Sequence, residues 1–190
     1  MEQNLNPFTH VKIAKEIHYY IKQNYEIDIP LKTFVWGNIK PDFKKDKKLH
    51  YIDRNLKEAV KMFKELNNFN YGNHKDYAVR LGEFFHYIAD FFCYAHNTDF
   101  FKENLGEHFI YEMKAHKKLS RFKDFFNNDF TESNIILNDS EDLLEYLIYS
   151  HKKYIKNWKK PENDFIYTLK LSPILINNII INNKLAEEVS

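Results

Sequence analysis

The sequence predicts an all-α protein, a single domain over residues 1–190 built as a helical bundle. Apolar residues recur at three- and four-residue intervals along most of the chain, which is the spacing of the buried side of a helix. Only 4 glycines and 5 prolines occur in 190 residues, so turns are scarce. A hydrophobic fraction of 44% with 29% charged residues is typical of a globular chain and not of a disordered one.

Start and stop signals place the first two helices. Thr9 is a suitable N-cap for a helix that continues to about Tyr25. Pro30 suits the first turn of a second, short helix, which Gly37 is expected to close. An irregular segment follows, and its Pro-Asp dipeptide at Asp42 is a common turn sequence.

Five further helices complete the expected bundle. Each has apolar residues at helical spacing and turn residues at its ends. Asp139 or Ser140 is expected to cap the fourth of them, and Ser172 with Pro173 provides the N-cap and the first residue of the last. The expected ranges are 51–67, 75–97, 107–119 and beyond, 140–159, and 172–188.

An aromatic stretch in the middle of the chain carries five residues of the types that bind metals. Their spacing is H-x3-D-x5-H-x11-H-x3-E, and they are His86, Asp90, His96, His108 and Glu112. Residues four apart lie on one face of a helix, so the first two and the last two could each hold an ion. On a continuous helix, His96 would lie about 9 Å beyond Asp90 and about 120° around the axis. The pattern therefore predicts two separate metal centres, with His96 turned toward the His108–Glu112 pair.

Two ordinary structural interpretations compete with this one. A single histidine on an apolar helix face is commonly a satisfied core residue, and an acid four residues from a histidine could simply be its hydrogen-bond partner. However, imidazole and carboxylate groups in a run as apolar as FFHYIADFFCYAH are costly to bury unless they are paired or bind a metal. Two such pairs with a fifth candidate ligand favour the metal interpretation.

The residues alone leave three more candidate ligands open. His10 lies in the first turn of the first expected helix, from which a side chain can reach a central site. Asp42 and His50 lie on the irregular segment, where a structural role is as plausible as a metal-binding one. Cys93 is the only cysteine, which excludes an internal disulfide and a cysteine-based zinc site. We expect it to pack as a small core residue.

Charge and hydropathy exclude several classes of partner. A formal net charge of +1 gives no reason to expect binding to long nucleic acid. No run approaches the roughly 18 apolar residues of a membrane-spanning helix. The N-terminal residues have neither the basic start nor the apolar stretch of a secretory signal. We therefore expect a cytoplasmic protein, or a secreted one whose signal has been removed.

The five-residue spacing, preceded by a Thr-His pair, a Trp-Gly…Pro-Asp loop and a further histidine, resembles the bacterial zinc-dependent phospholipase C family. That family includes the phosphatidylcholine-hydrolysing enzymes and the alpha-toxin catalytic domain, and the resemblance covers about His10 to Glu112. It implies an all-α bundle with up to three zinc ions in a cleft. It also implies three ligand sets: Asp42, His50, His86 and Asp90 for one ion, Asp90 and His10 for a second, and His96, His108 and Glu112 for a third.

One departure from the family concerns the N-terminus. Members begin with a tryptophan whose amine and carbonyl complete the shell of the zinc held by the first histidine. This chain begins with Met1 and has no tryptophan before Trp36. We hypothesise that the backbone groups of Met1 substitute.

The resemblance implies a phosphodiester hydrolase that acts on phospholipid headgroup esters. Asp42 is then the carboxylate nearest the attacking water, as ligand or as general base. Two alternatives remain open at this stage. One is a zinc phosphodiesterase or nuclease acting on nucleotides or single-stranded nucleic acid. The other is a non-catalytic helical metal-binding protein whose pocket binds a ligand or partner.

Overall fold

The computed structural model describes residues 7–43, 51–68, 73–97, 105–119 and 135–189, with side chains apart from those of residues 105, 108–109 and 181–189. Every regular element in these ranges is a helix, which confirms the expected class. None of them is long and apolar enough to cross a membrane. In chain order they are α1 (Pro7–Asn24), α2 (Leu31–Ile39), η1 (Lys40–Phe43), α3 (Ile52–Asn67), α4 (His74–Phe91), η2 (Tyr94–His96), α5 (Leu105–Leu119), α6 (Ser140–Asn157) and α7 (Glu162–Val189).

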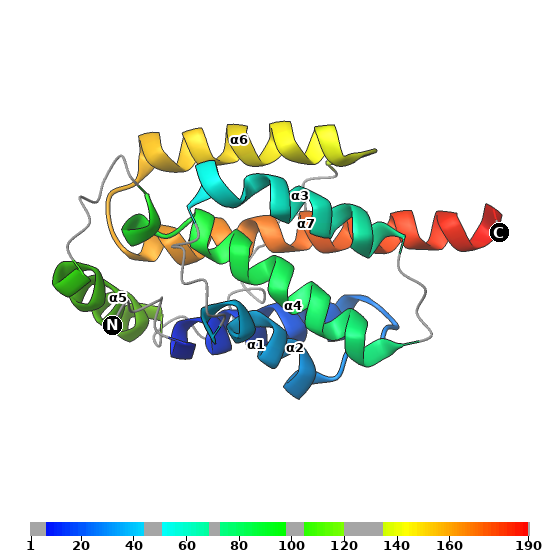
Figure 1. The fold of residues 1–190 in the computed structure, drawn as a ribbon, viewed down its shortest axis with the longest axis horizontal. Coiled ribbons are helices and arrows are strands. Elements are labelled where there is room, and N and C mark those ends of the chain that lie inside the picture. Colours follow the sequence, from blue (N-terminus) through cyan, green and yellow to red (C-terminus); the bar gives the residue numbers. More distant parts are fainter. Residues whose placement is uncertain (1–6, 44–50, 69–72, 98–104, 120–134, 190) are drawn as a thin grey trace.

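Helix α4 is the centre of the arrangement. It runs between α1 and α2 on one side and α3 and α7 on the other, and it contacts all four (Figure 1). Every residue from Leu81 to Phe91 is buried. A helix that is covered on all sides must be apolar around its whole circumference, and the aromatic residues of this stretch meet that requirement. The polar residues within it are therefore those that need an explanation.

Helices α2 and α4 touch through their backbones at two glycines. A Cβ atom on Gly37 would lie 2.2 Å from the carbonyl oxygen of Val79, and one on Gly82 would lie 2.3 Å from that of Phe34. Neither position has room for a side chain. The expectation that Gly37 closes its helix is therefore wrong, because α2 continues to Ile39 and the glycine instead permits close packing.

Helix α1 also differs from its expected start. It begins at Pro7, which suits a first helical position, so Thr9 lies inside the helix and is not its N-cap. The Thr9 hydroxyl is instead 3.3 Å from Nδ1 of His116 on α5. At α6 the expected cap is confirmed, because the Asp139 carboxylate accepts from the backbone N–H groups of Glu141 at 2.8 Å and Asp142 at 2.9 Å.

The last helix is longer than the sequence predicts. Helix α7 begins at Glu162, so Pro173 lies in its interior and Ser172 does not cap it. The Ser172 hydroxyl donates to the carbonyl of Thr168 at 2.8 Å, one turn back in the same helix. An interior proline costs about 3 kcal/mol. The leucine and isoleucine side chains buried on both sides of Pro173 outweigh that cost.

The close contact of α2 and α4 leads to a first prediction. Replacing Gly82 by Ala should lower the free energy of unfolding by about 3 kcal/mol, because the new Cβ would force two backbones apart. The measurement is urea unfolding followed by circular dichroism. Gly106→Ala, at an exposed position of α5, is the control and should leave stability almost unchanged. A Gly82→Ala protein as stable as the control would contradict the backbone contact.

Candidate metal centre

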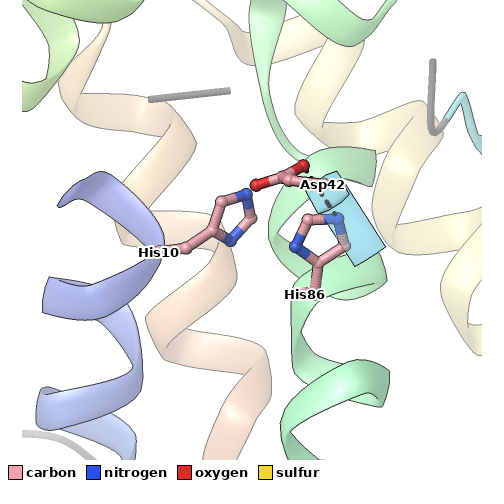
Figure 2. Close-up of side chains that lie close together, drawn as sticks. All are labelled: His10, Asp42 and His86. Atoms are coloured by element: carbon pink, nitrogen blue, oxygen red, sulfur yellow. Dashed lines mark ion pairs between the residues drawn. The ribbon is translucent and has the colours of Figure 1, made fainter. Parts of the chain in front are cut away.

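Three helical elements bring His10, Asp42 and His86 to one point. His10 extends from α1, Asp42 from the turn η1, and His86 from the central helix α4 (Figure 2). One ligand atom from each lies within 4.8 Å of the other two. The imidazole rings of His10 and His86 are stacked, with centroids 4.2 Å apart. His10 and His86 are completely buried, and the Asp42 side chain is 7% exposed.

Asp90 joins this cluster from α4, one turn beyond His86. Its Oδ2 lies 3.1 Å from Nε2 of His86, and its Oδ1 lies 3.3 Å from Nε2 of His10. The distance from Nε2 of His86 to Oδ1 of Asp42 is 3.6 Å. Nitrogen and oxygen ligands of a tetrahedral zinc ion, with bonds of about 2.1 Å, lie about 3.4 Å from one another. These three nitrogen–oxygen distances are therefore compatible with side chains that coordinate a bound cation.

Asn38 orients both histidines of the cluster. Nδ1 of His10 is 3.2 Å from the side-chain oxygen of Asn38, and Nδ1 of His86 is 2.8 Å from its backbone carbonyl. Both oxygens only accept, so each Nδ1 carries a proton and each Nε2 faces a carboxylate. The Asn38 amide nitrogen donates to the carbonyl of Gly82 at 3.1 Å, which fixes the orientation of the amide. Hydrogen bonds of this kind set the tautomer of metal-binding histidines.

The residues fit a bound cation. Nε2 of His10 is buried and faces Oδ1 of Asp90 at 3.3 Å, without a well-formed hydrogen bond among the described residues. A buried nitrogen in this state is costly, and a metal ion would satisfy it. Burial lowers the pKa of His10, but the carboxylates of Asp90 and Asp42 raise it more, so its pKa is above the ordinary value. The pocket thus has an electrostatic preference for positive charge.

A second pair of candidate ligands lies beside the first cluster. Nε2 of His96 is 3.6 Å from Oε1 of Glu112, and both side chains are buried. Nδ1 of His96 is 3.9 Å from Oδ2 of Asp90. The prediction that helical pitch carries His96 away from Asp90 is wrong, because α4 ends at Phe91 and the turn η2 directs the chain back. The two groups of ligands are therefore neighbours that meet at Asp90.

The remaining candidate ligands fall outside this description. Met1 and His50 lie outside the described residues, and for His108 only its backbone position in α5 is described. Asn38 is not among the site residues that the sequence predicts. Asparagine is not one of the usual zinc ligands, and its only sequence signal is its place after Gly37, which has meaning only once the contact of α2 with α4 is known. The resemblance assigned His10 to a different ion from Asp42 and His86, whereas the structure gathers all three in one cluster.

The role of Asn38 leads to a second prediction. Asn38→Ala should lower the affinity of the protein for zinc by about 10- to 100-fold, because His10 loses the acceptor that fixes its tautomer. Competition with a chelator measures this affinity. Asn178→Ala is the matched control, since Asn178 is also buried but bonds only to Ile135, Leu137 and Ile174 in the described contacts. Equal zinc affinities for the two variants would contradict the assigned role.

Comparison with known proteins places the chain in a family. A family model described as zinc dependent phospholipase C matches residues 9–161, which is well over half of the chain. No curated protein and no solved structure matches it. The matched region begins directly before His10 and includes the candidate ligands up to Glu112. Its helical elements and its cluster of histidine and carboxylate side chains agree with that match, and the chain belongs to the zinc-dependent phospholipase C family.

Proposed function

We propose that this protein is a zinc-dependent phosphodiester hydrolase, and specifically a phospholipase C that cleaves the headgroup esters of phospholipids. The observation that carries the proposal is the buried cluster of His10, Asp42, His86 and Asp90 in a chain of this family. Up to three zinc ions would be bound. The further ligands proposed for them are His50, His96, His108, Glu112 and the backbone groups of Met1.

The two carboxylates of the cluster have distinct tasks in this proposal. When bound, zinc would lower the pKa of a water molecule and neutralise the phosphate oxygens of the substrate. Asp90 faces both His10 and His86 with different oxygens, so it is suited to bridge two ions. Asp42 is the less enclosed carboxylate, with 7% side-chain exposure against 0% for Asp90. It is therefore better placed to accept a proton from an attacking water.

An exposed aromatic pair next to Asp42 supports a lipid as substrate. Phe43 is 63% exposed and stacks on Trp36, which is 48% exposed, with ring centroids 6.0 Å apart. Large apolar side chains grouped on a surface commonly mark a binding site. Two other aromatic residues, Tyr51 and Phe84, are buried and so are not part of this surface. An apolar approach to the site is thus assigned to Phe43 and Trp36.

A third prediction tests the reaction itself. The full chain should hydrolyse phosphatidylcholine, and a chelator should abolish the activity until zinc is returned. Asp90→Asn should lower the rate by about 100-fold or more, because a bridging carboxylate becomes a weak neutral ligand. Asp53→Asn, at an exposed position of α3, is the control and should retain full activity. Hydrolysis that neither the chelator nor Asp90→Asn affects would refute the proposal.

The same preparation separates the alternatives. Cleavage of nucleotide phosphodiesters or single-stranded DNA without cleavage of phospholipid would favour a nuclease. Zinc bound at a fixed ratio without hydrolysis of either substrate would favour a non-catalytic metal-binding protein. Elemental analysis of the purified chain gives the ratio of zinc to protein in every case.

A fourth prediction concerns the substrate. Phe43→Ala should raise KM for phospholipid vesicles by up to about tenfold, since the burial of one aromatic ring against lipid contributes about 1.4 kcal/mol. The value of kcat for a soluble short-chain ester should remain close to that of the wild type. Tyr149→Ala is the control, because Tyr149 has the same 63% exposure but lies on α6. An unchanged KM for Phe43→Ala would argue against the aromatic pair as a lipid contact.

A further inference from the structure

Asp164 is a buried carboxylate at the start of α7 that accepts four hydrogen bonds. Its Oδ1 accepts from the hydroxyl of Tyr154 at 2.8 Å and from the indole N–H of Trp158 at 2.9 Å. Its Oδ2 accepts from the backbone N–H of Tyr94 at 3.2 Å and from the hydroxyl of Tyr111 at 2.5 Å. The side chain therefore connects η2, α5 and the end of α6 to α7.

The bond to Tyr94 explains why α4 stops where it does. In a continuing helix, the N–H of Tyr94 would donate to the carbonyl of Asp90, four residues earlier. Asp164 accepts that N–H instead, and the Asp90 carbonyl receives the N–H of Cys93 at 3.1 Å. The chain then turns through η2, which places His96 beside Asp90 and Glu112. A residue seventy positions later in the sequence thus takes part in directing His96 inward.

The hydrogen bond from Tyr111 to Asp164 constrains the segment that carries Glu112, the partner of His96. Tyr111 directly precedes Glu112 in α5, and its ring lies 5.0 Å from that of Tyr94. A small cavity of about 20 Å³, enough for one water molecule, is lined by Glu112, Asp164 and Cys93 among others. Glu112 is therefore not held by close packing on this side. The hydrogen bond from Tyr111 to Asp164 therefore restricts the position of Glu112 on the side where packing does not.

The Asp164 carboxylate is a costly group to bury at this junction. Burial raises the pKa of Asp164 to about 7, although its four hydrogen bonds act in the opposite direction. An apolar residue in its place would leave four donors without this acceptor, which is also costly. A carboxylate is suited to accept bonds from two separate segments through one oxygen.

We propose that Asp164 is a positioning residue that holds His96 and Glu112 at the separation a shared zinc ion requires. The inference rests on the proposed zinc-dependent function. Asp164 lies beyond residues 9–161, the part of the chain that matches the family, so the family match does not assign it this role. Oδ2 constrains the segments that bear the two ligands, while Oδ1 joins α6 to α7.

Two tyrosines provide a matched test. Tyr111→Phe and Tyr154→Phe each remove one hydroxyl that donates to Asp164 and keep the ring, but only Tyr111 adjoins a candidate ligand. We expect Tyr111→Phe to lower the affinity for one bound zinc ion by about tenfold, and Tyr154→Phe to change zinc affinity by less than about twofold. Chelator competition with the full chain measures affinity, elemental analysis measures zinc per chain, and urea unfolding of the zinc-free proteins compares their stability.

The outcomes separate this inference from the proposed function. Equal effects of the two variants on zinc affinity would overturn the inference, as would a folded Asp164→Asn protein that retains every zinc with wild-type affinity. In either case a wild type that binds zinc and hydrolyses phospholipid leaves the proposed function intact. A wild type that binds no zinc would overturn both.

Discussion

The contact between the backbones of α2 and α4 is the constraint on which the site depends. Gly37 and Gly82 have no side chains, so the two helices approach until carbonyl oxygens occupy the space of a Cβ atom. Asn38 therefore lies against α4, where its amide nitrogen donates to the carbonyl of Gly82. From that position it reaches both His10 and His86. The orientation of two imidazoles thus follows from helix packing, before any ligand is considered.

Helix α4 also positions η1, the turn that carries Asp42. Glu83, next to Gly82, is buried, and it pairs with Lys40 at 2.7 Å and with Arg80 at 2.9 Å. Lys40 opens the short turn η1 that carries Asp42. Successive residues of α4 therefore position first α2 and then η1, and the next turns supply candidate ligands themselves. Burial strengthens such ion pairs, because water screens them less than it screens pairs at the surface.

The sequence predicts those features that depend on local pattern. Helical periodicity predicts the fold class and the presence of α1 to α7, and the spacing of His86 and Asp90 predicts that they share one face of α4. The features it fails to predict depend on residues far apart in the chain. Pro173 predicts a helix start because a proline is unfavourable inside a helix. The burial of leucine and isoleucine side chains against the rest of the bundle offsets this cost, and it cannot be seen in the local sequence. Asn38 becomes informative only through α4, more than forty positions away.

The end of α4 shows most clearly how tertiary structure decides the site. The aromatic run continues past Phe91 with neither glycine nor proline, so local sequence favours a longer helix. On such a helix His96 would lie about 9 Å beyond Asp90. The hydrogen bond from Tyr94 to Asp164 favours the turn instead, and His96 comes to 3.9 Å from Asp90. Asp90 then faces His10 with one oxygen, and His86 and His96 with the other. Because a single carboxylate contacts both groups of histidines, two ligand sets that would be separate on a regular helix form one continuous candidate site.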